Sequence, residues 1–279
     1  MAITTRDQLI NAMGNNSSRI VIDKSAMSGQ AAGTSVSLWR STGQPGQGAI
    51  PTTAAVCDHT LTGAIGFTQQ TGDVKSYLGI LEGMCSAASN TLEIHDRLMH
   101  MGGLSGTVTT AQTVNLDISA NLSTSNLDAR KGDANYSDVQ WWLEWYTATG
   151  GTAVTATVNV TFNDGTSGNL SAITLATSRP QSFMQPLNGL IQAADSGKYI
   201  RDVNTVQLSA TTGTAGNFGV TATRYRAGLY QPIANARMTA DWAALGLPQI
   251  ENSSCLFCIQ ATTNTTTGTV KAAGKIIHG

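Results

Sequence analysis

The chain has 279 residues, of which 41% are hydrophobic and only 12% are charged, and its formal net charge is -1. This length and hydrophobic content suffice for one large domain or two smaller ones, which argues against a globally disordered chain. The 16 lysines and arginines form no cluster, so the sequence predicts no nucleic-acid groove and no membrane-binding patch. The small net charge favours a subunit of an assembly over its alternative, an ordinary extracellular β protein.

The N-terminal segment predicts a short amphipathic helix. Thr5 and Gln8 form a capping-box pattern, and Gly14 is placed to end the helix. The N-terminus has neither the basic start nor the apolar run of a secretory signal, which indicates synthesis and retention in a cytoplasm. We interpret residues 1–14 as a docking segment, with three candidate partner contacts on its apolar side: Leu9, Ile10 and Met13.

Apolar and alternating runs then predict a series of strands, and Gly- and Pro-rich breaks predict the loops between them. The segment 43–48 is a loop by its glycine and proline content. The expected strands of the N-terminal half are residues 19–23, 35–40, 76–81, 91–99 and 107–118.

Residues 120–137 are polar and carry a local concentration of charge, which predicts an extended loop. A loop of this length in a compact β protein usually has a function or is disordered by itself, and a contact with another subunit would order it. The segment also offers a division of the chain: residues 15–279 form either one large β-rich domain or two β-sandwich halves that meet near 120–137.

The segment 139–147 predicts a strand that is apolar on both faces, because Trp142 and Tyr146 alternate with Trp141 and Trp145. Such a strand is either sandwiched between two sheets or exposes Trp142 and Tyr146 to a partner. These two residues are therefore further candidate contacts. Four neighbouring aromatic rings also allow a lectin-like sugar platform, which the sequence favours less than a core or interface role.

The clearest strand runs from Val154 to Phe162, where apolar residues alternate with Thr or Asn. The Asp164-Gly165 turn predicts a hairpin with residues 169–175. The 38 threonines of the chain supply an uncharged, β-branched surface that favours sheets and tolerates close contact with another protein.

The C-terminal third continues the pattern. We expect a helical turn or two within residues 185–194 and a short capped helix over residues 241–246. The alternation at 206–210 resumes at 218–222 after a Gly-rich turn, which predicts a second hairpin, and two last strands are expected at 255–261 and 268–277. Many short strands without long helices predict an all-β fold, an antiparallel β-sandwich or jelly-roll-like structure with a short N-terminal helix.

The residue types that carry chemistry are sparse. Cys255 and Cys258 form a Cys-x-x-Cys pair without a second pair, so we interpret them as buried structural thiols and expect no metal or cofactor. His95, Asp96 and His100 are the densest titratable cluster, but neighbouring residues of a strand face opposite ways. No nucleophile elbow, phosphate loop or zinc-protease motif occurs, and the sequence predicts no enzyme.

Several motifs, spread over most of the chain, resemble those of a group of small structural proteins of tailed bacteriophages. They are Ser37-Leu38-Trp39-Arg40 with the following Gly-Pro-Gly loop, Tyr77-Leu78, Asp96-Arg97-Leu98 with Gly102-Gly103-Leu104, Trp141-Trp142-Leu143-Glu144-Trp145-Tyr146, the stretch from Thr212 to Gly219, and the stretch from Asp241 to Gly246. None of these motifs is enzymatic, so the resemblance implies a part in virion architecture.

Our leading hypothesis is a capsid decoration or cement protein, a homotrimer made in the host cytoplasm that binds the phage major capsid protein on the outside of the shell. It contacts neither nucleic acid nor membrane. The first alternative is a tail or head-to-tail component, and the alternative of another class is a carbohydrate-binding module that uses Trp142 and Tyr146. A glycan hydrolase is the weakest reading.

Overall fold

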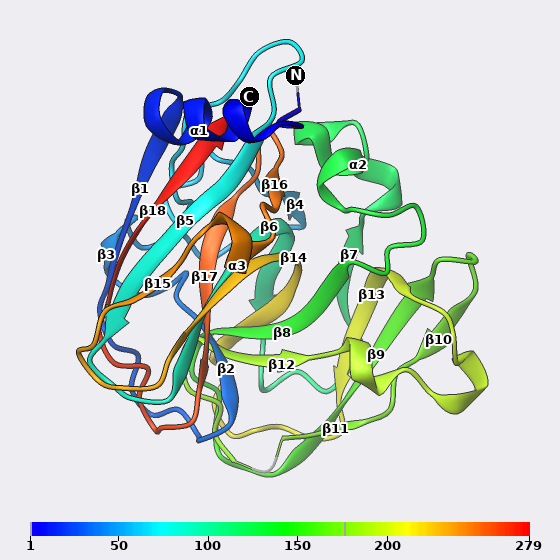
Figure 1. The fold of residues 1–279 in the computed structure, drawn as a ribbon. Coiled ribbons are helices and arrows are strands. Elements are labelled where there is room, and N and C mark those ends of the chain that lie inside the picture. Colours follow the sequence, from blue (N-terminus) through cyan, green and yellow to red (C-terminus); the bar gives the residue numbers. More distant parts are fainter. Residues whose placement is uncertain (1, 176) are drawn as a thin grey trace. The chain divides into compact units, whose positions relative to one another are not determined.

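The computed structural model describes residues 2–175 and 177–279 and shows a mainly antiparallel β protein with an N-terminal helix (Figure 1). The predicted fold class is confirmed. The chain divides into two compact units, one made of residues up to 48, 58–96 and 225–279, and the other of residues 49–57 and 97–224. The segment 120–137 lies inside the second unit, so the chain does not divide there.

The first unit is a β-sandwich. One sheet has the order β15-β5-β18-β1-β3, and β16 pairs with β5. Its strands are β1 (Ser17–Lys24), β3 (Gly43–Gln44), β5 (Ser76–Cys85), β15 (Met238–Ala240), β16 (Gln249–Ile250) and β18 (Val270–His278). The opposite layer pairs β17 (Leu256–Thr262) with β2 (Thr34–Ser37) and with the first part of β6 (Asn90–Leu104). Inward apolar residues of both layers, such as Ile20, Leu78, Ile94 and Leu256, form one hydrophobic core.

Helix α1 (Arg6–Asn15) lies across the ends of β1 and β18 in this unit (Figure 1). The predicted capping box is present, because the Thr5 hydroxyl accepts from the Gln8 N–H and the Gln8 side chain accepts from the Thr5 N–H. The helix continues through Gly14 and is capped at Asn16. The other helix of the unit, α3 (Trp242–Leu245), was also predicted, and the carboxylate of Asp241 caps it.

The second unit is another two-layer β structure. One sheet has the order β10-β9-β13-β7, and β11 pairs with β9. Its strands are β7 (Gln112–Asp117), β9 (Val154–Phe162), β10 (Ser167–Asn169), β11 (Ile173–Leu175) and β13 (Ile200–Leu208). The other layer places β8 (Val139–Thr147) between β12 (Phe183–Pro186) and the first part of β14 (Asn217–Gln231), and β4 (Ala55–Val56) pairs with the end of β6. The second core lies between these layers.

The strand of clearest alternation behaves as predicted. Every apolar residue of β9 is buried and the intervening positions are exposed or half-buried. The Asp164-Gly165 turn leads back into β10 and β11, which both pair with β9. The first predicted hairpin is therefore confirmed, with its second strand divided into two short strands. The second predicted hairpin is wrong, because β13 pairs with β7 and β9, whereas β14 pairs with β8 in the other layer. Alternation identifies strands but does not identify their partners.

Other local expectations need correction. Residues 120–137 are not an extended loop, because they contain 3₁₀ turns at Ser119–Asn121 and Thr124–Asn126 and the short helix α2 (Leu127–Arg130). The Arg130 side chain is buried and donates to the backbone carbonyls of Cys57 and Arg97, which fixes this segment in its unit. The helical turn or two predicted within residues 185–194 is confirmed as two 3₁₀ turns, Asn188–Leu190 and Ala193–Asp195, which follow the end of β12. Strand β2 ends at Ser37, three residues before the predicted end.

Candidate interaction surface

The aromatic residues of β8 do not form a surface. Tyr146 is fully buried and Trp142 is 7% exposed, with its indole N–H donating to the Thr223 hydroxyl at 2.9 Å. The prediction that these two residues contact a partner is therefore wrong. They cannot stack on a sugar either, since a binding platform needs an exposed ring face.

The outward side of β8 is buried because it supports an ionic network. Glu144 accepts from the Arg97 guanidinium at 2.5 and 3.3 Å, and neither side chain is exposed. The Tyr146 and Thr221 hydroxyls both contact the same carboxylate. Burial alone would lower the pKa of Arg97, but Glu144 holds it above its ordinary value, while burial raises the pKa of Tyr146. The network is structural, since no group in it reaches solvent.

The three candidate partner contacts on helix α1 differ in how far their side chains are exposed. Leu9 is 9% exposed and packs with Ala12 against Ile277, and Met13 is partly buried against the same cluster. Ile10 points away from that cluster and is 62% exposed. Helix α1 is thus fixed to its own sheet by two of the three candidates, and Ile10 alone offers an accessible apolar contact. Met1 lies outside the described residues.

The titratable cluster of β6 is engaged in local contacts. His95 is buried, lies 3.0 Å from the Glu93 carboxylate and packs edge-on against Tyr225. The Asp96 carboxylate accepts from the Ser254 hydroxyl and the Cys255 N–H, both at 2.9 Å. Among residues 2–175 and 177–279, no three His, Cys, Asp or Glu side chains are grouped as metal ligands.

Cys255 and Cys258 are both buried free thiols. Burial raises the pKa of Cys258 to about 12, although the nearby Lys24 ammonium opposes this effect. A thiol in this environment stays protonated and unreactive at neutral pH. The described part of the chain also has no helix with the length and apolar character that a membrane crossing requires.

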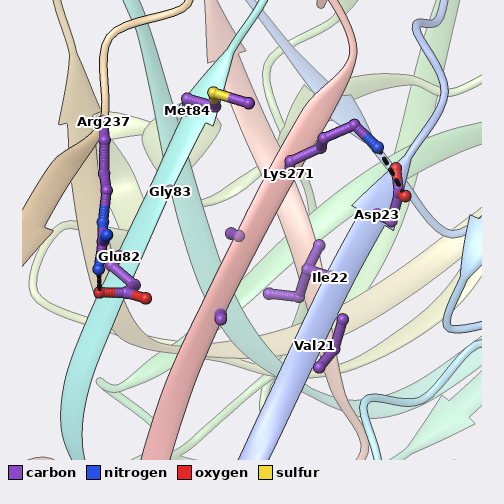
Figure 2. Close-up of a pocket in the computed structure, with 10 residues that line it drawn as sticks. Val21, Ile22, Asp23, Glu82, Gly83, Met84, Arg237 and Lys271 are labelled. Atoms are coloured by element: carbon purple, nitrogen blue, oxygen red, sulfur yellow. Dashed lines mark hydrogen bonds and ion pairs between the residues drawn. The ribbon is translucent and has the colours of Figure 1, made fainter.

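A shallow furrow lies on the outer face of the β1-β18-β5 sheet (Figure 2). Two adjoining hollows of about 310 and 230 Å³ share Glu82 and Ala273. The furrow follows β18, where Ala273 lies between Val21 of β1 and Glu82 of β5. A small residue on the central strand between longer residues on its neighbours leaves a groove, since side chains at paired positions project from the same face.

Charged side chains border the furrow. Lys271 reaches across to Asp23, with its ammonium 2.8 Å from the carboxylate, and Arg237 pairs with Glu82 on the other side (Figure 2). Val21 is 44% exposed between these pairs, and Met84 and Ile80 are half-buried. The surface thus combines accessible apolar area with a charged rim, an arrangement typical of protein interfaces.

At the α1 end of the furrow, Arg19 and Lys275 are directly paired across β1 and β18. The Lys275 ammonium donates to the Met13 carbonyl at 3.1 Å, near the C-terminal end of helix α1. Sequence reasoning missed this surface, although the alternation Lys271, Ala273, Lys275 was a readable signal of a strand with a basic outer face and a gap at its centre.

A second titratable feature lies in the other unit, where the Asp117 and Asp202 carboxyls are hydrogen-bonded to each other. Asp202 also accepts from the Ile118 N–H at 3.1 Å and from Arg201 at 2.7 Å. Burial and the negative charge of Asp117 raise the pKa of Asp202 to about 6, against the opposing effect of Arg201. Asp117 caps the 3₁₀ turn that follows it, so this pair ties the 118–121 turn to β13.

The chain matches no protein-family model and no curated protein. Among the solved structures to which it is weakly similar are structures of infectious bursal disease virus particles and of its VP2 protein. A VP2 subviral particle is 10% identical, with 94% of this chain and 79% of that chain covered at a TM-score of 0.18. The T13 viral particle is 9% identical, with 94% and 76% covered at a TM-score of 0.18. At such scores the likeness carries no argument about function.

Proposed function

We propose that this protein is a structural subunit of a tailed-bacteriophage particle that binds the outer surface of the capsid as a decoration subunit. Its partners in this proposal are the major capsid protein and further copies of itself in a trimer. The protein is made in the host cytoplasm and resides in the virion. It acts by binding alone and catalyses no reaction.

The observation that carries the proposal is the outer face of the β1-β18-β5 sheet. It is wide and shallow, with exposed Val21 beside small Ala273, and it resembles a protein-binding surface more than an enclosed small-molecule site. The low charge and the threonine-rich strands of the chain support the same reading, since uncharged polar groups cost less to desolvate than charged groups do.

The second support is the rigidity of the scaffold. Two sandwich cores, a buried Arg97–Glu144 pair and a helix fixed by Leu9 give a subunit that is ordered before it binds. A preorganised surface loses little conformational entropy on docking. Repeated many times over a shell, interfaces of about 800 Å² per partner would sum to a large resistance against internal pressure.

The carbohydrate-binding alternative loses its site with the burial of Trp142 and Tyr146. The tail or head-to-tail alternative would use the same furrow. Electron cryo-microscopy of intact particles separates these readings. We expect density for this chain at many copies over the shell. Density confined to the tail would overturn the capsid location, and absence of the chain from particles would overturn the virion proposal.

A matched stability assay tests the role directly. Heads that lack the protein are heated alongside complete heads, and DNA release is followed by a fluorescent dye. We expect release at a lower temperature from the heads that lack it. Restoring the purified protein should return the release temperature to that of complete heads. Equal release temperatures in all three samples would contradict a cementing role.

A further inference from the structure

The outer face of the β1-β18-β5 sheet is more basic than the chain that carries it. Six charged side chains border the furrow, four of them cations and two of them anions, which gives a net charge of +2 on a chain of net charge -1. They are Arg19, Lys271, Lys275, Arg237, Asp23 and Glu82.

The excess positive charge is concentrated at the α1 end of the furrow. Lys271 and Arg237 are neutralised by Asp23 and Glu82. Arg19 and Lys275, in contrast, are directly paired cations, and among the described residues no carboxylate lies within ion-pair distance of Arg19. Like charges at paired positions of a sheet destabilise it. A carboxylate placed over Arg19 and Lys275 would offset this repulsion.

The shape of the furrow restricts what that anion is. From Lys271 to Lys275 the floor of the furrow follows one strand over four residues, about 13 Å at the rise of a β-strand. Its centre is apolar and narrow over Ala273, with Val21 and Met84 beside it. A free phosphate or other small anion would leave this apolar floor uncovered. An extended peptide covers it and places alternate side chains into the furrow.

We propose that this face binds an extended acidic segment of another protein, with a carboxylate over Arg19 and Lys275 and a small apolar side chain over Ala273. The inference deepens the proposed function, and it rests on that function only for the identity of the partner as a capsid subunit. The two neutralised ion pairs at the other end then lie beside the apolar part of the segment.

Two variants distinguish the contribution of the cationic pair to binding from that of the open space over Ala273. Arg19→Glu places a carboxylate beside Lys275, which removes the cationic pair and leaves a favourable neighbour in the sheet. Ala273→Leu leaves every charge in place and fills the centre of the furrow. Arg6→Glu is the matched control, since the Arg6 side chain is 87% exposed on helix α1 and does not line the furrow.

The probe is a fluorescent peptide of about nine residues in which glutamate alternates with alanine, and a lysine-alanine peptide serves as the charge control. Binding to the full chain is followed by fluorescence anisotropy at low salt. We expect saturable binding of the acidic peptide alone, weakened roughly tenfold or more by Arg19→Glu and by Ala273→Leu, and unchanged by Arg6→Glu. Added salt should weaken it further.

Equal binding by the parent chain and both furrow variants would overturn the inference, and so would binding of both peptides alike. Co-sedimentation of the same variants with particle heads tests the proposed function separately. If the parent chain and Arg19→Glu occupy heads equally, the decoration role stands and the acidic-segment inference fails. If the parent chain binds the acidic peptide but no head, the furrow inference stands and the capsid proposal fails.

Discussion

The buried ion pair between Arg97 and Glu144 allows the sharpest test of the energetics. Glu144→Gln keeps the shape of the side chain and removes its charge, so the buried Arg97 guanidinium loses the carboxylate with which it pairs on the outward side of β8. Breaking a buried pair by removing one partner costs about 3–5 kcal/mol. The Tyr146 and Thr221 hydroxyls, which both contact the same carboxylate oxygen, would also meet an amide in its place. We expect destabilisation of about 4 kcal/mol and a fall in Tm of roughly 10 °C.

Urea unfolding followed by tryptophan fluorescence measures this change, because three of the five tryptophans, Trp141, Trp142 and Trp145, lie in β8 beside the pair. Asp138→Asn is the control. Asp138 also pairs with an arginine of the same unit, Arg224 at 2.8 Å, but its side chain is 44% exposed. Its loss should cost at most about 1 kcal/mol. If Glu144→Gln and Asp138→Asn lowered the free energy of unfolding equally, the reasoning would be refuted, because burial would then have no effect on the energy lost when an ion pair is broken.

Three further predictions concern stability. The raised pKa of Asp202 means that the folded state holds a proton which the unfolded state releases, so the contribution of Asp202 to the free energy of unfolding should fall by about 2 kcal/mol as pH rises from about 4 to 6. Urea unfolding of the parent and Asp202→Asn at several pH values measures this contribution as the difference between the two chains, and a difference that does not change with pH would contradict it. Gly219→Ala should destabilise by at least about 2 kcal/mol because the added Cβ would lie 1.7 Å from the Met101 carbonyl oxygen, whereas Gly189→Ala, with open space around it, should unfold like the parent. Leu9→Ala should cost about 2 kcal/mol and Ile10→Ala almost nothing in thermal unfolding, since only Leu9 is packed; similar losses would mean that helix α1 is not docked as described.

Local signals of the sequence predicted local structure well. The alternation of Val154 to Phe162 produced the buried and exposed faces of β9, and the capping box of Thr5 and Gln8 produced α1. Both features are set by residues that lie close together in the sequence, within a single strand or a single helical turn. The Asp164-Gly165 turn likewise fixes the pairing of neighbouring strands.

Long-range features were not predictable in the same way. Arg97 and Glu144 are 47 residues apart and lie on different strands, so no spacing in the sequence relates them. Trp142 and Tyr146 were read as sandwiched or exposed because alternation shows that two faces exist but not what covers each face. The false hairpin between β13 and β14 has the same origin, because both strands are real and their partners are non-local.

The cationic pair on the surface gives a last test that does not depend on any partner. If Arg19 and Lys275 repel each other across β1 and β18, Arg19→Glu should stabilise the free chain by roughly 0.5 kcal/mol, while Arg19→Gln should give a smaller gain. Thermal unfolding at low salt measures both, and high salt should erase the difference. A variant that stabilises the fold and weakens docking would show that the parent residue serves binding at the expense of stability. A loss of stability in both variants would instead assign Arg19 a structural role and remove the argument for a bound anion.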